Sequence, residues 1–267
     1  MRIPFGLQGW SRVLRLWTRH PLLGLGQLSA HDYCSPGLGD LPGDIERYFP
    51  SVHQVMSFNP RVPHISREDK RQPGVGFVTW DESTVLMNVA KRFSHGLGLE
   101  IGCWMGWSTV CLALSDIHLD VIDPGLGSGM QADTVRYALQ AAGVAERVNL
   151  VKGLSPEDVH VLGQKGHRWT FCFIDGDHAG DAPRRDISAV LNYCEPDCAI
   201  MCHDTINENV YEAMSNLAQC GWQVTFLQTA VGLGIAWRGK IDPPQHIADP
   251  AVNWRAVGLY PDNCYDP

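Results

Sequence analysis

The stretch from residue 99 to residue 106 reads Leu99-Glu100-Ile101-Gly102-Cys103-Trp104-Met105-Gly106. Its apolar start continues a run that begins at Leu97, which predicts a short buried strand over 97–101. The two glycines predict a sharp turn, because a residue without a Cβ lets the backbone approach a ligand closely. A helical pattern follows over 107–115. The stretch therefore predicts a strand, a ligand-binding turn and a helix in succession.

The same alternation continues through the centre of the chain. Apolar runs predict further strands at 119–122, 148–151, 171–174 and 198–202, and helical patterns cover 130–142, 156–162, 183–194 and 207–219. Strands separated by helical stretches of about ten residues indicate right-handed βαβ units and a parallel sheet. The last two runs, 222–228 and 234–237, are joined by a short loop and predict a hairpin. We therefore expect a Rossmann-like α/β fold, with a mostly parallel seven-stranded sheet that ends in an antiparallel hairpin.

Three regions are expected along the chain. Residues 80–240 carry the alternation and form the main domain, whose first helix is capped by Asp81 or Ser83. Residues 1–79 are rich in turn-forming residues and predict an irregular extension with short helices, which contacts substrate or a second subunit. Residues 241–267 are rich in Pro and Asp and predict a tail that packs on the domain.

The net charge and the distribution of apolar residues argue against nucleic-acid binding and against a membrane span. The 267 residues carry a formal net charge of −8 and show no dense basic stripe. Binding to nucleic acid through phosphates is therefore disfavoured, since that mode relies on clustered Lys and Arg. No stretch is long and apolar enough to span a bilayer. We expect a cytoplasmic enzyme that acts on a small molecule and forms a dimer or larger homo-oligomer.

The nine cysteines are an odd number, and several lie in strand-like apolar runs without any CxxC pair. This usage is typical of reduced, buried cysteines. Cys194, Cys198 and Cys202 are regularly spaced, but the intervening residues 195–197 predict a turn. The three thiols are therefore not expected to share one helical face or to hold a metal.

The residues around the first turn favour a nucleoside ligand with a positive charge. Glu100 directly precedes the glycines, and their spacing differs from GxGxxG, which brings a pyrophosphate onto a helix N-terminus. An acid at this place suits S-adenosylmethionine, which has an ammonium, a sulfonium and no phosphate. Asp123 ends the second strand, where an acid can accept both ribose hydroxyls, and Ser155 follows the third strand, near the adenine. The expected cofactor-binding residues are Glu100, Gly102, Trp104, Ser108, Asp123, Ser155 and Asp175.

Acidic and histidine side chains follow the fourth and fifth strands. Asp175 and His178 come after the fourth strand, and His203 and Asp204 come after the fifth. Both strands end at the same edge of a parallel sheet, and acids gathered there repel one another unless a cation or protons intervene. We therefore expect a divalent metal, Mg²⁺ or Mn²⁺, on Asp175, His203 and Asp204. The alternative is that Asp177 and Asp204 only cap the following helices.

His178 is the expected general base. The ordinary pKa of histidine lies near working pH, which suits removal of a proton from a hydroxyl. We expect Asp175 to share the catalytic role with it. The alternative is a loop histidine that only hydrogen-bonds the backbone.

These motifs carry a resemblance to a known family. They resemble the class I S-adenosylmethionine-dependent methyltransferases, and within them the branch near the catechol, caffeoyl-coenzyme A and macrocin-type sugar O-methyltransferases. The resemblance covers about residues 80–238 and rests on 99–102 with 106–109, on Phe173-Ile174-Asp175-Gly176-Asp177-His178, and on His203-Asp204-Thr205.

The resemblance implies a role for each matching position. Asp175 matches the metal-binding acid after strand four, and His203 with Asp204 matches the metal-binding pair after strand five. His178 falls where the catechol-type enzymes have a catalytic Lys, and His203 falls where metal-dependent members commonly have an acid. Glu100 and Gly102 match the cofactor loop, and Asp123 matches the ribose acid.

The function implied is O-methylation of a small metabolite, such as a sugar or a phenol in secondary metabolism. Three alternatives stay open. The first is a metal-independent N- or O-methyltransferase. The second is a hydroxylase-like enzyme on the same fold, and the third is a non-catalytic relative, since a fold does not determine function.

Overall fold

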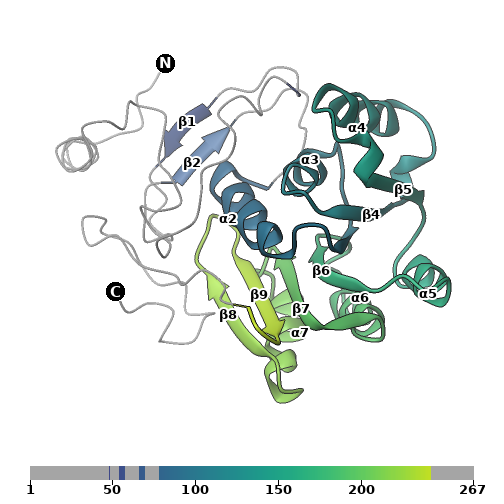
Figure 1. Cartoon of the computed structure of the whole chain (residues 1–267). Helices are drawn as coiled ribbons and strands as arrows, with labels where there is room; N and C mark the ends of the chain where they lie inside the picture. The colour runs from purple at the N-terminus through teal and green to yellow at the C-terminus, as the bar shows by residue number, and fades with distance from the viewer. Residues whose placement is uncertain (1–47, 49–53, 58–65, 70–77, 242–267) are drawn as a thin grey trace, which may run out of the picture.

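The computed structural model describes residue 48 and residues 54–57, 66–69 and 78–241 (Figure 1). Most of the predicted N-terminal extension and the tail from 242 to 267 lie outside the described residues. Within the described part, no helix has both the length and the apolar character needed to cross a membrane.

The central sheet has seven strands in the order β5-β4-β3-β6-β7-β9-β8. The strands are β3 (Leu97–Ile101), β4 (His118–Asp123), β5 (Val148–Lys152), β6 (Trp169–Ile174), β7 (Cys194–His203), β8 (Gln223–Leu227) and β9 (Leu233–Arg238). The first five pair in parallel, whereas β9 pairs antiparallel with both β7 and β8. The predicted mostly parallel sheet with a terminal hairpin is therefore confirmed.

Helices cover both faces of this sheet (Figure 1). One apolar cluster joins the sheet to α2 (Trp80–Ala90), α3 (Trp107–Ala113) and α4 (Met130–Ala141). A second cluster joins the opposite face to α5 (Glu157–Gln164), α6 (Ala182–Leu191) and α7 (Glu208–Gln219). A parallel sheet buried on both faces explains why its central strands read as continuous apolar runs.

The N-terminal region contains strands where short helices were expected. Residues Gln54–Ser57 form β1 and Ser66–Asp69 form β2, and the two strands pair antiparallel outside the main sheet. The prediction of short helices is therefore wrong for these eight residues.

The start of α2 also differs from the prediction. Its N-cap is Thr79 rather than Asp81 or Ser83. Thr79 Oγ1 accepts a hydrogen bond from the backbone N of Glu82, and the Glu82 carboxylate accepts one from the backbone N of Thr79. This reciprocal capping box satisfies two backbone donors at once, whereas a cap at Asp81 or Ser83 would have begun the helix later.

The junction of α6 and β7 is the third correction. The helix ends at Leu191, and the strand already begins at Cys194, before the predicted turn at 195–197. Between the pairs Trp169↔Cys194 and Phe171↔Ala199, β6 advances two residues while β7 advances five. The extra residues leave the ladder as a bulge around Pro196, which has no N–H to contribute to it.

Glu100, in the middle of β3, is a carboxyl group with no exposed surface. Thr109 Oγ1 donates a hydrogen bond to its Oε2 at 2.6 Å, while Oε1 has no hydrogen-bond partner among the described residues. Burial raises the pKa of Glu100 to about 8, because the charged form loses its hydration. The group is therefore neutral in the folded domain near pH 7.

The natural protein is expected to lose stability as the pH rises, and we predict that Glu100→Gln removes this loss. The folded domain keeps the Glu100 proton up to a pKa of about 8, while the unfolded chain loses it near its ordinary value of 4.5. The free energy of unfolding of the natural protein therefore falls as pH rises between these values, by a few kcal/mol, on the order of 1.4 kcal/mol per unit. Thermal melts from pH 5 to pH 9 should show similar stability at the acid end and a more stable variant at the alkaline end. The exposed Glu146→Gln is the control, and identical pH slopes in natural protein and Glu100→Gln would contradict the assignment.

Candidate active site

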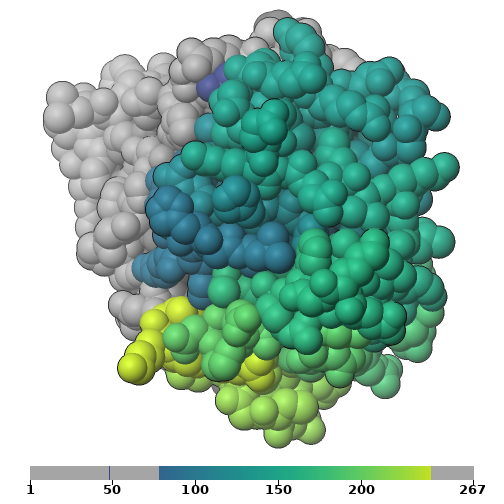
Figure 2. Space-filling view, turned by 45° about the vertical axis from the view of Figure 1, so that its right-hand side comes forward, coloured from purple at the N-terminus to yellow at the C-terminus, as the bar shows by residue number. Residues whose placement is uncertain are grey.

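A cavity of about 880 Å³ opens at the carboxyl ends of the parallel strands. In the space-filling view, the blue and teal half of the domain lies above the green and yellow half (Figure 2). The cavity draws its lining from both halves, from the turn after β3 and the ends of β4, β5, β6 and β7. Among the predicted site residues, its lining includes Gly102, Trp104, Ser108, Asp123, Ser155, Asp175, His178 and Asp204. Glu100 and His203 are not part of the lining.

The turn after β3 approaches β6 very closely. Gly102 has a φ of +80°, and a Cβ placed on it would lie 2.2 Å from the carbonyl oxygen of Asp175. The backbone N of Asp175 in turn donates to the carbonyl of Ile101 at 2.8 Å. Trp104 also has a positive φ, of 45°, and its side chain is 52% exposed beside the cavity. Only glycine fits at position 102, which explains the residue type there.

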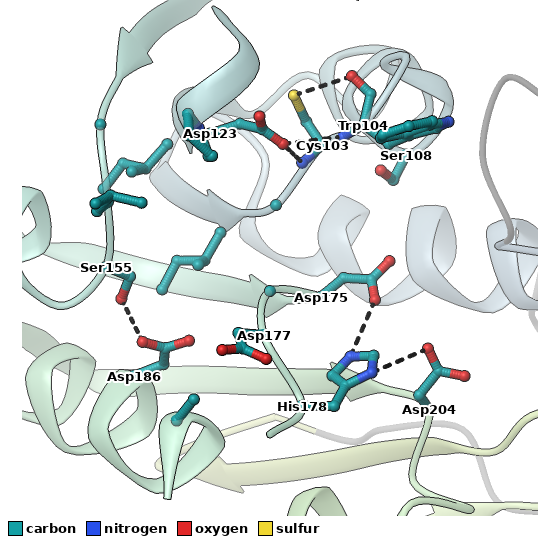
Figure 3. Close-up of a pocket in the computed structure, with 18 of the residues that line it drawn as sticks. Cys103, Trp104, Ser108, Asp123, Ser155, Asp175, Asp177, His178, Asp186 and Asp204 are labelled. Carbon is teal, nitrogen blue, oxygen red and sulfur yellow. Dashed lines mark hydrogen bonds and ion pairs between the residues drawn. The ribbon is translucent and has the colours of Figure 1, made fainter. Parts of the chain in front are cut away.

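Asp123 anchors this turn from the end of β4. Its Oδ2 accepts hydrogen bonds from the backbone N of Cys103 at 3.0 Å and of Trp104 at 3.2 Å (Figure 3). Its Oδ1 accepts from the backbone N of Gly125 and from Nε2 of Gln131, each at 2.7 Å. Of these four donors only Gln131 is a side chain. A ribose that hydrogen-bonds to Asp123 would therefore take the place of the Gln131 amide.

The other predicted cofactor residues are spread around the same cavity. Ser155 Oγ donates to Asp186 Oδ1 at 2.6 Å, on the side away from His178 (Figure 3). Ser108 lies at the start of α3 and hydrogen-bonds to Glu100. Glu100 thus stands one layer behind the cavity wall, with Ser108 between it and the cavity.

Asp175, His178 and Asp204 converge on the opposite side of the cavity. His178 lies between the two carboxylates, with Nε2 3.7 Å from Asp175 Oδ1 and Nδ1 3.7 Å from Asp204 Oδ2 (Figure 3). The predicted meeting of the ends of β6 and β7 therefore holds for these three side chains. Asp204 has a positive φ of 57°, in the left-handed region that a short polar side chain tolerates.

His203 lies beneath this group instead of in the cavity, with 1% of its surface exposed. Its Nε2 is 3.0 Å from Glu82 Oε2. Its Nδ1 is 3.4 Å from Asp175 Oδ1 and 3.3 Å from Asp204 Oδ2. One ring nitrogen is thus engaged by Glu82, and the other faces both carboxylates of the cavity.

Glu82 is the site residue that sequence reasoning missed. It is fully buried, and its Oε1 accepts a hydrogen bond from Thr229 Oγ1 at 2.5 Å. The spacing Thr79-x-x-Glu82 is a readable capping-box signal. Its contact with His203, 121 residues away, has no local signal in the sequence.

The charges of this group support one another. Burial opposes the charge on His203, but the carboxylates of Glu82 and Asp175 outweigh it and raise the pKa of His203 well above its ordinary value. Burial likewise opposes ionisation of Asp175, yet His203 and His178 lower the pKa of Asp175 well below the usual range. The nearby carboxylate of Asp175, and then that of Asp204, raise the pKa of His178, and burial only partly offsets this effect. These shifts all favour a charged His203 beneath a charged Asp175.

A divalent cation fits the upper part of this group. Asp175, His178 and Asp204 each offer one ligand atom, and these three atoms lie within 4.8 Å of one another. His178 Nε2 has no hydrogen-bond partner among the described residues. Two carboxylates suit Mg²⁺ or Mn²⁺, and an imidazole in the set shifts the preference toward Mn²⁺.

Comparison with known proteins agrees with this fold. A family model described as a methyltransferase domain matches residues 99–205, from β3 to the residues just after β7. The O-methyltransferase from Bacillus cereus in complex with SAH is 20% identical, over 63% of this chain and 86% of that chain, with a TM-score of 0.54. The O-methyltransferase TomG from Streptomyces achromogenes, involved in tomaymycin synthesis and solved with SAM, is 19% identical over 63% and 83%, with a TM-score of 0.53. The SAH-bound methyltransferase PaMTH1 from Podospora anserina is 13% identical over 90% and 99%, with a TM-score of 0.56.

At these identities the solved structures establish the fold, and the family model adds the type of domain. The resemblance inferred from the three motifs is thereby confirmed as far as a methyltransferase domain. Residues 99–205 match such a domain, and the chain shares the fold of the SAM- and SAH-bound methyltransferases named above.

Proposed function

We propose that this enzyme transfers a methyl group from S-adenosylmethionine to a hydroxyl of a small molecule, such as a sugar or a phenol. The observation that carries the proposal is the group Asp175, His178 and Asp204, which lies in the same cavity as the Gly102 turn. A hydroxyl must lose a proton as it is methylated, and this group offers a proton acceptor together with carboxylates. Two solved structures of the same fold are titled O-methyltransferases, which supports the same reading.

The cofactor half of the cavity is assigned to the turn after β3 and the ends of β4 and β5. Asp123 is placed to take the ribose, and Ser155 lies on the side proposed for the adenine. S-adenosylmethionine supplies a methyl group on a sulfonium, which is already a good leaving group. The protein must mainly hold donor and acceptor in line, which proximity and orientation accomplish.

The acceptor half is assigned to Asp175, His178 and Asp204. The imidazole of His178 takes the proton of the acceptor hydroxyl, and Asp175 orients that imidazole. A divalent cation on Asp175 and Asp204 would lower the pKa of the acceptor hydroxyl, as bound metals do for water. In this proposal His203 orients the two carboxylates from below. The sequence had instead suggested that His203 binds the metal directly.

The first test is binding of the methyl donor. Calorimetry should show one S-adenosylmethionine bound per chain. Asp123→Ala should weaken this binding about 10-fold or more, because the ribose loses a charged hydrogen-bond acceptor, and a hydrogen bond to a charged group contributes about 1.5–3 kcal/mol. Gln131→Ala is the matched control, since it removes only the side chain that competes for Asp123. Its affinity should be equal to or higher than that of the natural protein. No binding at millimolar cofactor would overturn the assignment of the cavity.

The second test concerns the metal. Methyl transfer to a panel of sugars and phenols, followed as S-adenosylhomocysteine release, should fall on treatment with EDTA and return with added metal. Recovery with Mg²⁺ as well as Mn²⁺ indicates a site made of Asp175 and Asp204 alone, whereas recovery with Mn²⁺ only indicates that His178 is a third ligand. Full activity in the presence of chelator would exclude a required metal. Asp175 and Asp204 would then act only as polar partners of His178 and His203.

The third test concerns His178. His178→Ala should lower kcat by about 10²–10⁴-fold, the usual contribution of a general base, while the affinity for S-adenosylmethionine stays nearly unchanged. Because the base must be neutral, kcat of the natural enzyme should rise with pH through the pKa of His178, which Asp175 and Asp204 raise in the metal-free protein. The exposed His118→Ala is the control. A variant that keeps the natural kcat and pH profile would exclude His178 as the base.

A further inference from the structure

Three thiols meet in the second apolar cluster, on β6 and β7. Cys172 comes from β6, and Cys194 and Cys198 come from the first part of β7. Their Sγ atoms all lie within 4.8 Å of one another. None of the three residues lines the methyltransferase cavity.

The bulge in β7 brings these thiols together. In a regular strand residues 194 and 198 would lie on the same face, and their Cα atoms would be about 13 Å apart along the strand. Here five residues of β7 pass alongside two of β6, and the excess around Pro196 loops out of the ladder. Cys194 and Cys198 thereby reach the same neighbour, Cys172. The sequence drew attention to the regular spacing of Cys194, Cys198 and Cys202. In the structure the third member of the cluster is Cys172 and not Cys202.

The spacing of the sulfur atoms suits a soft cation. A Zn–S bond of about 2.3 Å requires sulfur atoms about 3.8–4.0 Å apart in tetrahedral or trigonal coordination. The observed upper limit of 4.8 Å is within a small side-chain movement of that distance. Thiolate ligands select Zn²⁺ and Cu⁺ over the harder cations that suit carboxylates.

The surroundings favour a charge on Cys194 and oppose one on Cys172 and Cys198, whose pKa values are raised by burial and by their neighbours in the cluster. Arg238, on β9, donates from Nη2 to the carbonyl of Cys194 at 3.1 Å and to that of Glu195 at 3.0 Å. Hydrogen bonds from Cys172 and Cys198, with Arg238 in addition, lower the pKa of Cys194. Three thiolates and a divalent cation carry one net negative charge, which the guanidinium of Arg238 compensates.

Burial distinguishes the three positions. Cys172 and Cys198 have no exposed surface, whereas Cys194 is partly exposed. An ion can therefore enter beside Cys194, and a water molecule can complete four-fold coordination from that side. An ordinary apolar role for buried cysteine would account for Cys172 and Cys198. It would not account for a third thiol at the solvent side, next to an arginine.

We propose that Cys172, Cys194 and Cys198 form a binding site for a thiophilic cation, Zn²⁺ or Cu⁺, separate from the methyltransferase cavity. Binding replaces the three thiol protons, which are released to solvent, and joins the bulge of β7 to β6. The site is independent of the proposed methyl acceptor and of any cation on Asp175 and Asp204.

The test uses the full chain with Cys34, Cys220 and Cys264 replaced by serine, so that the remaining cysteines are the six that the structure describes as buried or partly buried. Cd²⁺ is the spectroscopic probe, because thiolates give a charge-transfer absorption with it and carboxylates do not. One equivalent of Cd²⁺ should produce this absorption in the reduced protein. Native mass spectrometry after Zn²⁺ or Cu⁺ addition identifies which of the two ions is retained, and either result supports the site.

Cys194→Ala is the decisive variant, because its partly exposed position tolerates replacement. It should abolish the Cd²⁺ absorption and weaken Zn²⁺ binding by about 100-fold or more, since even indirect ligand partners commonly account for 10–100-fold. Cys202→Ala is the matched control, a buried cysteine of the same strand outside the cluster. Binding of S-adenosylmethionine should be unchanged in both variants and reports on folding.

Two outcomes would overturn the proposal. One is the absence of charge-transfer absorption in the folded serine background. The other is an absorption that persists in Cys194→Ala, which would place the thiolate ligands elsewhere. Should a variant fail to fold, alkylation of the serine background decides the matter, because bound Zn²⁺ must protect Cys194 from iodoacetamide. Equal labelling of Cys194 with and without Zn²⁺ would contradict the site.

Discussion

The buried pair of Glu82 and His203 is the interaction on which the acceptor half of the site depends. Glu82 belongs to the first turn of α2, accepts a hydrogen bond from Thr229 beyond β8, and meets His203 at the end of β7. Three segments far apart in the chain thus share one carboxylate. Removing one partner of a buried charge pair leaves the other uncompensated, at a cost of about 3–5 kcal/mol. This pair therefore stabilises the sheet edge and fixes the ring that faces Asp175 and Asp204.

The same pair changes the electrostatic argument for a metal. Carboxylates that gather at one sheet edge require a compensating charge. His203, whose pKa is raised by Glu82 and Asp175 against the effect of burial, supplies a positive charge directly beneath Asp175 and Asp204. Convergence of the acids is thus explained by the protein alone. The case for a divalent cation rests on the donor set of the cavity, and not on repulsion between its acids.

Local patterns in the sequence were sufficient for the seven-stranded sheet and the helices between its strands, because each of these elements has its own apolar periodicity and its own turn residues. They were also sufficient to bring Asp175, His178 and Asp204 together, since parallel strands end at one edge. They failed where a side chain has a distant partner or where the ladder is irregular. Nothing near Glu82 indicates His203, and the bulge at Pro196 depends on how β7 pairs with β6.

The close contact between the two halves of the cavity follows from strand pairing. The turn at Gly102 leaves no room for a Cβ against the carbonyl of Asp175, and the Asp175 amide is bonded to Ile101. The backbone that shapes the proposed cofactor turn therefore also positions the carboxylate that faces His178. Because Gly102 and Asp175 directly follow the neighbouring central strands β3 and β6, any shift of one moves the other. A transfer reaction that depends on the alignment of donor and acceptor gains from this arrangement, since their separation is determined by the rigid sheet and not by flexible loops.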